Sequence, residues 1–314
     1  MRAVIFNRFG GTDVLEIADI AKPTIQADEV LVRVHAAAVN PKDTFVRKGR
    51  FQRLTGKRFP MQLGYDFAGE VAAVGDRVTN FTEGQAVFGM LDIWQGRTCA
   101  EYLAVSQNML AGMPTVLTYT EAAAIPLTAS TSLQALRDEA DIKEGEHVGI
   151  NGASGGVGTA AVQIAKLYGA SVTAISSAVN HDFLTSLGAD TCIDYHETDV
   201  AAGDLRFDIF FDVFGNQPFK RIKPVLARSG TWVSTVVKPH VFISQWVTRL
   251  FGRQKARQVI VKARHTDLAL IRDWIEAGHL RPIVQDVFPL DKIREAHAQQ
   301  ETKHTRGKIV VTID

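Results

Sequence analysis

Glycines crowd one short stretch of the chain, NGASGGVGTAAVQIAKLYGA at residues 151–170, where four of them fall within seven residues. The stretch follows an apolar segment, 147–151, and leads into a run with the periodicity of a helix. Amides at the start of a helix carry partial positive charge and can bind phosphate. The pattern is typical of a loop that binds the pyrophosphate of a dinucleotide, although a tight strand-to-helix turn would also use it.

The loop matches the dinucleotide fingerprint G-x-G-x-x-G at two of its three glycine positions, with Ala153 at the first. Gly155 would let the backbone approach the pyrophosphate, and Gly158 would let the helix pack closely against the strand. The candidate cofactor-binding residues of this loop are Ser154, Gly155, Gly156, Val157 and Gly158.

The second strand of the motif decides which dinucleotide is expected. An NAD site has a carboxylate near the end of that strand, where it binds the ribose hydroxyls. Here the strand ends in Ser176 and Ser177, and the next acid, Asp182, falls in the following helix. Hydroxyls and a cationic His181 would tolerate a 2′-phosphate, so we expect NADPH in preference to NADH. The alternative is that the two serines only begin a turn.

The elements around the loop alternate between strand and helix patterns from about residue 119 to 264. Such alternation predicts a doubly wound parallel sheet, a Rossmann α/β fold. Ligands bind at the carboxyl ends of the strands in such sheets. Phe214, Thr235 and Val236 follow the fourth and fifth strands, and we therefore include them among the cofactor-binding candidates.

Residues before about 118 have a different texture. Short segments rich in β-branched residues, among them 1–6, 29–39 and 67–75, are separated by Gly, Asn and Asp. This pattern predicts a largely antiparallel barrel or sandwich. A helix is expected over 120–140, and the chain after 267 should form helices and a last strand.

Composition excludes several classes of function. The 314 residues are 46% hydrophobic and 22% charged, as in a soluble globular protein, and the net charge of +1 predicts no nucleic-acid partner. Two cysteines cannot form a disulfide framework, and the nine histidines show no pair with metal-binding spacing. The first residues are too short an apolar run for a signal peptide, so a cytoplasmic location is expected.

Several stretches together resemble the medium-chain dehydrogenase/reductase superfamily, and within it the zinc-free quinone oxidoreductase branch. They are AAAVNPKDTFVRKG (36–49), FPMQLGYDFAGEVAAVG (59–75), EAAAIPLTASTSLQAL (121–136), the glycine loop, NHDFLTSLGADTCIDY (180–195) and GKIVV (307–311). The resemblance implies a GroES-like, barrel-type catalytic domain, 1–120 plus 267–314. A Rossmann domain that binds NADP, 121–266, is inserted into it.

The resemblance also implies roles for individual residues. Asn40 and Asp43 would lie by the nicotinamide and its ribose, and Thr131 beneath the ring. Tyr65 would donate a hydrogen bond to a substrate carbonyl, unless it only packs in the barrel. Tyr195 would join the two serines at the 2′-phosphate, and Lys308 would reach the active site, unless it is a solvated lysine. Asp43 could instead be structural, paired with Arg47.

The zinc alcohol dehydrogenases of this superfamily have cysteine and histidine ligands where this chain has Asn40 and Tyr65, which are poor zinc ligands. We therefore predict no metal and no alcohol oxidation. The expected activity is NADPH-dependent hydride transfer to quinones or α,β-unsaturated carbonyls.

Two other functions stay open. A reductase of 2-enoyl or 2-haloacrylate carboxylates would need a cation, which Lys42, Arg47, Lys48 or Arg50 could supply. A weakly catalytic protein that binds NADPH as a structural or sensing module is the other. A homodimer is expected through edge pairing of a sixth strand, 258–264.

Residues 213–266 contain no acid but eleven lysines and arginines. Within them, 238–257 combines Trp246, Leu250 and Phe251 with five basic residues. The segment could be a basic amphipathic helix that touches a membrane surface. We favour the alternative of a lid or a contact between subunits whose basic side is solvated.

Overall fold

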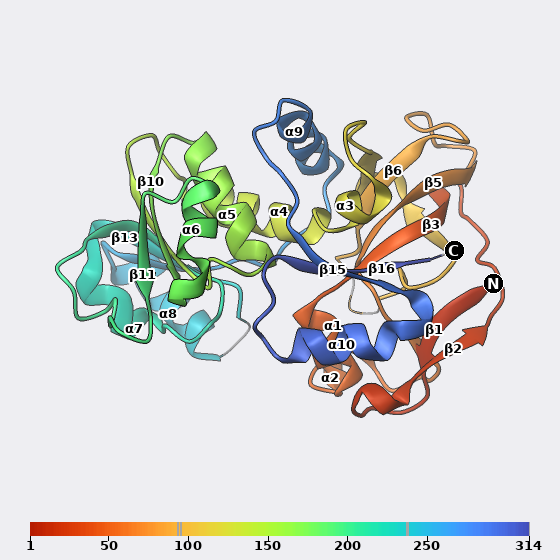
Figure 1. The fold of residues 1–314 in the computed structure, drawn as a ribbon, viewed down its shortest axis with the longest axis horizontal. Helices are drawn as coiled ribbons and strands as arrows, with labels where there is room; N and C mark the ends of the chain where they lie inside the picture. Colours follow the sequence, from red (N-terminus) through yellow and green to blue (C-terminus); the bar gives the residue numbers. More distant parts are fainter. Residues whose placement is uncertain (93, 95, 237–238, 314) are drawn as a thin grey trace. The chain divides into compact units, whose positions relative to one another are not determined.

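The computed structural model of the chain describes residues 1–92, 94, 96–236 and 239–313 (Figure 1). It divides into two compact units. Unit 1 comprises Met1–Ser130 and Lys262–Asp314, and unit 2 comprises Thr131–Val261. The first boundary falls inside α4 (Pro126–Leu133), whereas the sequence prediction places it at 120/121.

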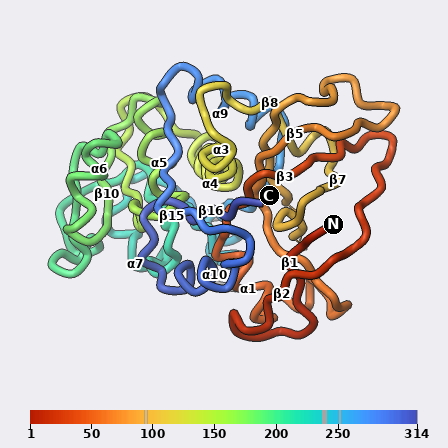
Figure 2. Tube along the Cα trace, turned by 45° about the vertical axis from the view of Figure 1, so that its right-hand side comes forward, coloured from red at the N-terminus to blue at the C-terminus, as the bar shows by residue number. Residues whose placement is uncertain are grey.

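Unit 1 contains a seven-stranded sheet with the order β15-β16-β3-β5-β6-β8, in which β7 also pairs with β3. Its strands are β3 (Glu29–Val39), β5 (Asp66–Val74), β6 (Ala86–Met90), β7 (Tyr102–Ser106), β8 (Leu110–Gly112), β15 (Val284–Pro289) and β16 (Lys308–Thr312). The last strand, β16, runs antiparallel to β3, with Ile309 opposite Val39. Figure 2 shows this C-terminal segment among the N-terminal strands, so the tail completes the sheet that the N-terminal part begins.

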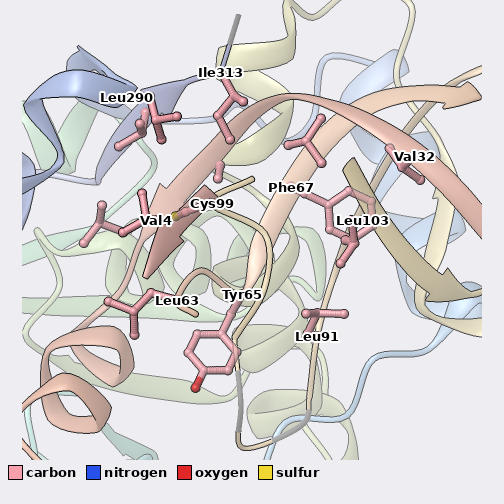
Figure 3. Packing of buried hydrophobic residues seen from close by; sticks show 14 of the residues in the cluster. Val4, Val32, Leu63, Tyr65, Phe67, Leu91, Cys99, Leu103, Leu290 and Ile313 are labelled. Atoms are coloured by element: carbon pink, nitrogen blue, oxygen red, sulfur yellow. The ribbon is translucent and has the colours of Figure 1, made fainter. Parts of the chain in front are cut away.

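A smaller sheet of three strands completes the β-structure of unit 1: β1 (Arg2–Phe6), β2 (Leu15–Asp19) and β4 (Met61–Gln62). The helices are α1 (Pro41–Arg47), α2 (Gln52–Thr55), α3 (Tyr119–Ala123), α4, α9 (His265–Glu276) and α10 (Ile293–Glu301). Apolar side chains that alternate along these strands, including Val4, Val32, Phe67 and Leu103, share one buried core (Figure 3).

The single helix predicted over 120–140 is wrong. The chain forms α3, then α4, then a π-helical segment, Gln134–Glu139. Pro126 lies at the start of α4, where its missing amide and fixed φ are tolerated, but it cannot continue the helix that precedes it.

Unit 2 is a six-stranded parallel sheet with the order β11-β10-β9-β12-β13-β14, the doubly wound arrangement that the sequence predicts. The strands are β9 (His147–Asn151), β10 (Ser171–Ser176), β11 (Thr191–Asp194), β12 (Phe207–Asp212), β13 (Leu226–Ser234) and β14 (Lys255–Gln258). The helices are α5 (Gly156–Leu167), α6 (His181–Ser186), α7 (Phe219–Ile222) and α8 (Pro239–Phe251). The central strands are apolar on both faces because helices cover both sides of a parallel sheet.

The sixth strand lies at Lys255–Gln258 and not at 258–264, so that prediction is wrong. Residues 259–264 form no strand, and Ile260 is exposed. No helix within the described ranges is both long and apolar enough to span a bilayer.

Candidate active site

Three polar side chains from distant parts of the chain meet inside unit 1. The Lys308 ammonium donates hydrogen bonds to Asn40 Oδ1 and to Asp66 Oδ2, the latter at 3.2 Å. Asn40 Nδ2 donates to the same Asp66 oxygen at 2.9 Å, and all three side chains are buried. The second Asp66 oxygen accepts from the Leu127 amide at 2.6 Å. Lys308 is therefore not a solvated lysine, and its contact with a cofactor stays a prediction.

Asp43 holds the start of α1 in place. Its two carboxylate oxygens accept from the amides of Asn40 and Gly64, each at 2.8 Å. Burial raises the pKa of Asp43 to about 6 against the opposing effect of these hydrogen bonds. The predicted pairing of Asp43 with Arg47 is wrong, because the buried Arg47 forms its ion pair with Glu301.

Tyr65 lies in the hydrophobic core, with its phenol oxygen pointing away from the aliphatic side chains in Figure 3. Its hydroxyl donates to the Trp94 carbonyl at 2.7 Å, and burial raises its pKa above the usual value. The phenol proton is thus engaged by the backbone, as in the packing interpretation of this residue. Its predicted hydrogen bond to a substrate stays untested.

Lys42 lies beside Tyr65. Its ammonium is 3.9 Å from the centroid of the Tyr65 ring and 5.4 Å from that of Trp94, positions that suit cation–π attraction. Desolvation lowers the pKa of Lys42 to about 8, although Asp43 and Asp92 act in the opposite direction. A half-buried ammonium with this pKa can stabilise negative charge or donate a proton near neutral pH.

The glycine loop of unit 2 leaves open space where a phosphate could bind. Gly152 has a φ of +82°, and its carbonyl would lie 2.2 Å from a Cβ at Gly158. A Cβ at Gly155 would instead meet no atom closer than 3.7 Å. Within the described part of the chain, no side chain caps the amides at the start of α5. Such amides are the groups that bind the phosphates of a dinucleotide.

Beside this loop, the carboxyl ends of the central strands are tied together. Asn151 Nδ2 donates to Asp212 Oδ1 at 2.7 Å, and the Asp212 carboxylate also accepts from the amides of Gly215 and Gln217. The Thr235 hydroxyl donates to the Val213 carbonyl at 2.9 Å. These bonds hold the turns that carry the three candidates from this edge, Phe214, Thr235 and Val236.

A Cβ at Gly152 would contact Phe214, and one at Gly215 would collide with Val236. The structure therefore brings the glycine loop, Phe214 and Val236 together. Phe214 is half exposed at this edge.

The end of β10 carries the two serines. Ser176 is buried and donates to the Ser177 carbonyl at 3.1 Å, whereas Ser177 Oγ accepts from Asn180 Nδ2 at 3.1 Å. A carboxylate that the sequence reasoning missed, Asp194, lies close by and accepts from the Ala178 amide at 3.2 Å. His196 donates to it from its amide and pairs with it through Nδ1, each at 2.9 Å, and these bonds help to lower the pKa of Asp194.

Tyr195 and a missed cation, Arg221, line the same cavity of about 290 Å³ at the edge of unit 2. Half of the Tyr195 surface is exposed, and Arg221 pairs with Asp199 at 2.9 Å. The other lining residues are Ile175, His196, Glu197, Thr198, Asp199, Val200 and Gln217.

Two buried polar atoms among the candidates have no hydrogen-bond partner among the residues that the structure describes. They are Thr131 Oγ1, in α4, and His181 Nε2, at the start of α6. A buried polar atom without a partner is costly, so each fits a role in binding a group from outside the chain.

Together, the doubly wound sheet and its open, uncapped glycine loop define a protein that binds a dinucleotide. Two family models match the chain: "Alcohol dehydrogenase GroES-like domain" over residues 26–134 and "Zinc-binding dehydrogenase" over residues 187–311. The chain belongs to the medium-chain dehydrogenase/reductase superfamily, and within it to the quinone oxidoreductase-like branch.

Three relatives carry this assignment. The chloroplastic quinone-oxidoreductase homolog of Spinacia oleracea is 30% identical over 99% of this chain and 98% of its own. The chloroplastic NADPH-dependent alkenal/one oxidoreductase of Arabidopsis thaliana is 32% identical over 99% of this chain and 79% of its own. The solved structure of the quinone oxidoreductase from Coxiella burnetii has a TM-score of 0.92 and 32% identity over 100% and 99% of the two chains.

Zinc, which the second family description implies, does not fit the residues present here. Asn40 Oδ1 and Asp66 Oδ2 already accept hydrogen bonds from the Lys308 ammonium, a cation that a zinc ion would have to displace. The Tyr65 hydroxyl donates to a backbone carbonyl. The described residues contain no group of three His, Cys, Asp or Glu that could hold a metal.

Proposed function

We propose that this protein is a zinc-independent oxidoreductase that uses NADPH to reduce quinones or α,β-unsaturated carbonyls. The observation that carries the proposal is the uncapped start of α5 beside the open face of Gly155, in the loop where a dinucleotide's phosphates bind. Two relatives, a quinone-oxidoreductase homolog and an alkenal/one oxidoreductase, support the two classes of acceptor.

When bound, the nicotinamide supplies the hydride. The amides of the glycine loop would hold the pyrophosphate, and the Thr131 hydroxyl, unpartnered among the described residues, would be available to bind the nicotinamide. By the family resemblance, Asn40 and Asp43 would be the residues of unit 1 that hold the nicotinamide and its ribose. Asn40 is positioned for this by Lys308 and Asp66, and Asp43 by the Gly64 amide.

Lys42 stabilises the oxygen of the acceptor, on which negative charge develops as the conjugated system is reduced. Its position above the Tyr65 ring and its lowered pKa support this role, since a partly desolvated ammonium can also return a proton. Tyr65 supports the ammonium through its ring, while its hydroxyl stays on the Trp94 carbonyl.

For the nucleotide we propose NADPH rather than NADH. Ser177, Tyr195 and His181 would bind the 2′-phosphate, and Arg221, in the same cavity as Tyr195, supplies a cation there. Asp194 would oppose the phosphate, but hydrogen bonds from Ala178 and His196 engage its carboxylate. The buried Ser176 hydroxyl donates to the Ser177 carbonyl, so Ser176 would position Ser177 beside the phosphate.

A hydride-transfer experiment tests the proposal. The protein is incubated with NADPH carrying deuterium at both C4 positions, together with a small enal, and the product is examined by NMR. Deuterium bound to the acceptor carbon supports the proposal. NADPH binding with no deuterium in the enal product, and with no NADPH oxidation by a quinone, would instead support the weakly catalytic binding module.

A second function, reduction of a 2-enoyl or 2-haloacrylate carboxylate, is favoured by one observation. Of the four cations that the sequence offers as anchors, Arg47 and Lys48 pair with Glu301, and Arg50 lies over the Phe45 ring. Lys42, whose ammonium is 3.9 Å from the centroid of the Tyr65 ring and 5.4 Å from that of Trp94, is the fourth cation and could bind a carboxylate. Preference for 2-haloacrylate over a quinone and an enal would establish this function.

The homodimer and the cytoplasmic location remain predictions. A dimer would need a surface other than the outer edge of β14, because the Ala256 and Gln258 amides donate to side chains of α8. Gel filtration of the purified chain tests the dimer, and cell fractionation tests the location.

A further inference from the structure

Helix α8 presents its apolar side to solvent and its polar side to the protein. Phe242, Ile243, Trp246, Val247 and Leu250 are all exposed, Trp246 to 65% and Ile243 to 62%. These five side chains follow one another at helical spacing and form one continuous stripe, called here the α8 face. A helix on the surface of a globular protein normally has the opposite orientation.

The polar side of α8 is used by the sheet. Thr248 Oγ1 accepts from the Ala256 amide at 3.0 Å, and Gln245 Oε1 accepts from the Gln258 amide at 3.1 Å. These alternate amides of β14 point away from β13, so the two side chains satisfy the free edge of the last strand. The bonds fix the rotation of α8 about its axis, and with it the outward direction of the α8 face.

Basic residues lie on this helix and directly after it in the chain. Arg249 lies on the helix itself, and Arg253 and Lys255 follow directly after it, all three exposed. They belong to residues 213–266, which contain eleven lysines and arginines and no acid, one of them, Lys238, being outside the described residues. An exposed apolar stripe with a tryptophan, bordered by cations, has the chemistry of a helix that lies in the interface of an anionic bilayer.

We propose that the α8 face binds the surface of membranes that contain anionic lipids, with Trp246 and its apolar neighbours among the headgroups and the cations on the lipid phosphates. A second copy of the chain fits less well. A twofold contact centred on this face would bring the same cations of both copies together, with no carboxylate in the segment to pair with them. The proposal is independent of the redox activity.

The test is sedimentation of the full-length protein with vesicles of phosphatidylcholine, with and without phosphatidylglycerol, at low and high salt. We expect binding to the anionic vesicles that high salt weakens, together with a blue shift of the tryptophan emission. Trp246→Phe should keep the binding and lose most of the shift, which would place α8 in the interface.

Two sets of variants separate the contribution of the cations to membrane binding from that of the apolar side chains. Arg249→Gln, Arg253→Gln and Lys255→Gln together should weaken binding roughly a hundredfold, because each cation near the surface contributes about a factor of five. Ile243→Ser, Trp246→Ser and Leu250→Ser together should abolish it. The matched controls, which should bind as the parent does, are Lys57→Gln, Arg58→Gln and Lys303→Gln for charge, and Leu54→Ser, Val116→Ser and Val287→Ser for exposed apolar groups.

All altered side chains are exposed, so the melting temperature should stay within a few degrees of the parent's. Three results would overturn the proposal. They are no binding to anionic vesicles, equal binding to neutral vesicles, and a dimer in sedimentation velocity that dissociates when the α8 face is changed to serine.

Discussion

The ammonium of Lys308 lies 3.2 Å from Asp66 Oδ2, with both side chains buried, although the two residues are 242 positions apart in the chain. The contact ties β16, the last strand, to the start of β5. A buried ion pair is stabilising only while both partners and their hydrogen bonds are present, because each lone charge would be poorly solvated.

Lys308→Met should therefore destabilise unit 1 strongly, by about 3–5 kcal/mol, because it leaves the Asp66 carboxylate unpaired. Chemical denaturation followed by tyrosine and tryptophan fluorescence would measure the change, with the exposed Lys303→Met as the control. Unchanged stability together with a raised KM for NADPH would show that Lys308 serves the cofactor instead.

The glycines of the loop should differ in what their substitution changes. Gly158→Ala places a Cβ 2.2 Å from the Gly152 carbonyl oxygen, so it should lower the melting temperature. Gly155→Ala meets no atom within 3.4 Å and has an ordinary φ of −77°, so it should fold normally. It should still weaken NADPH binding by about tenfold, equivalent to about 1.4 kcal/mol, because its methyl group occupies the space of the phosphate. Calorimetry and a binding titration of both variants would separate the effect on stability from the effect on NADPH binding. Equal melting temperatures of Gly158→Ala and Gly155→Ala would contradict the predicted difference.

The pH profile of the activity should have a basic limb, a fall at high pH, that results from deprotonation of Lys42. Burial lowers the pKa of Lys42 to about 8, and the ammonium form is the one that stabilises the acceptor oxygen. The value of kcat/KM should therefore fall as the pH rises through about 8. Lys42→Met should lower kcat by about a hundredfold and remove this limb, whereas Lys57→Met should change neither. An unchanged pH profile in Lys42→Met would exclude the role.

Nucleotide preference should depend on Tyr195 and Arg221. Tyr195→Phe and Arg221→Gln should each raise the KM for NADPH about tenfold by removing a hydrogen bond to a charged phosphate, and leave the KM for NADH unchanged. Tyr102→Phe, in unit 1, is the control. Parallel changes for both nucleotides would mean that these residues do not contact the 2′-phosphate.

The buried His297 should make the stability sensitive to acid. Burial, assisted by Arg47, lowers the pKa of His297 to about 3, whereas the unfolded side chain titrates near 6.5. As the pH falls from 6.5 toward 3, the unfolded chain binds a proton that the folded chain does not, so stability is lost. His297→Leu should lose less stability over this range than the exposed-site variant His304→Leu. Asp43, whose raised pKa changes the stability in the opposite direction, is present in both variants, so its contribution cancels in the comparison. Identical slopes of stability against pH in the two variants would contradict the prediction.

The sequence predicts most accurately those features that depend on neighbouring residues. The glycine loop, its flanking strands and the parallel order of the sheet follow from local spacing and hydrophobic pattern, and the doubly wound fold is confirmed. The sequence prediction missed the helix break at Pro126 because the apolar composition of 120–140 was given more weight than the proline. It misplaced the sixth strand because a strand of four residues has too short a hydrophobic pattern to locate.

Contacts between distant residues could not be predicted in this way. The partners of Lys308 and the approach of Arg221 to Tyr195 depend on how separate elements pack. Two signals were nevertheless present. Asp66 stands at the start of an apolar strand, where a buried carboxylate requires a partner. Asp194, the acid in TCIDY, ends the strand that follows the one carrying the two serines.

The initial rate of NADPH oxidation, measured with an ortho-quinone and a small enal in the presence of a metal chelator, tests the central claim most directly. We expect turnover of at least one of these acceptors, slower with NADH and unaffected by the chelator. NADPH that binds but is oxidised with neither acceptor, or turnover that the chelator abolishes, would contradict it.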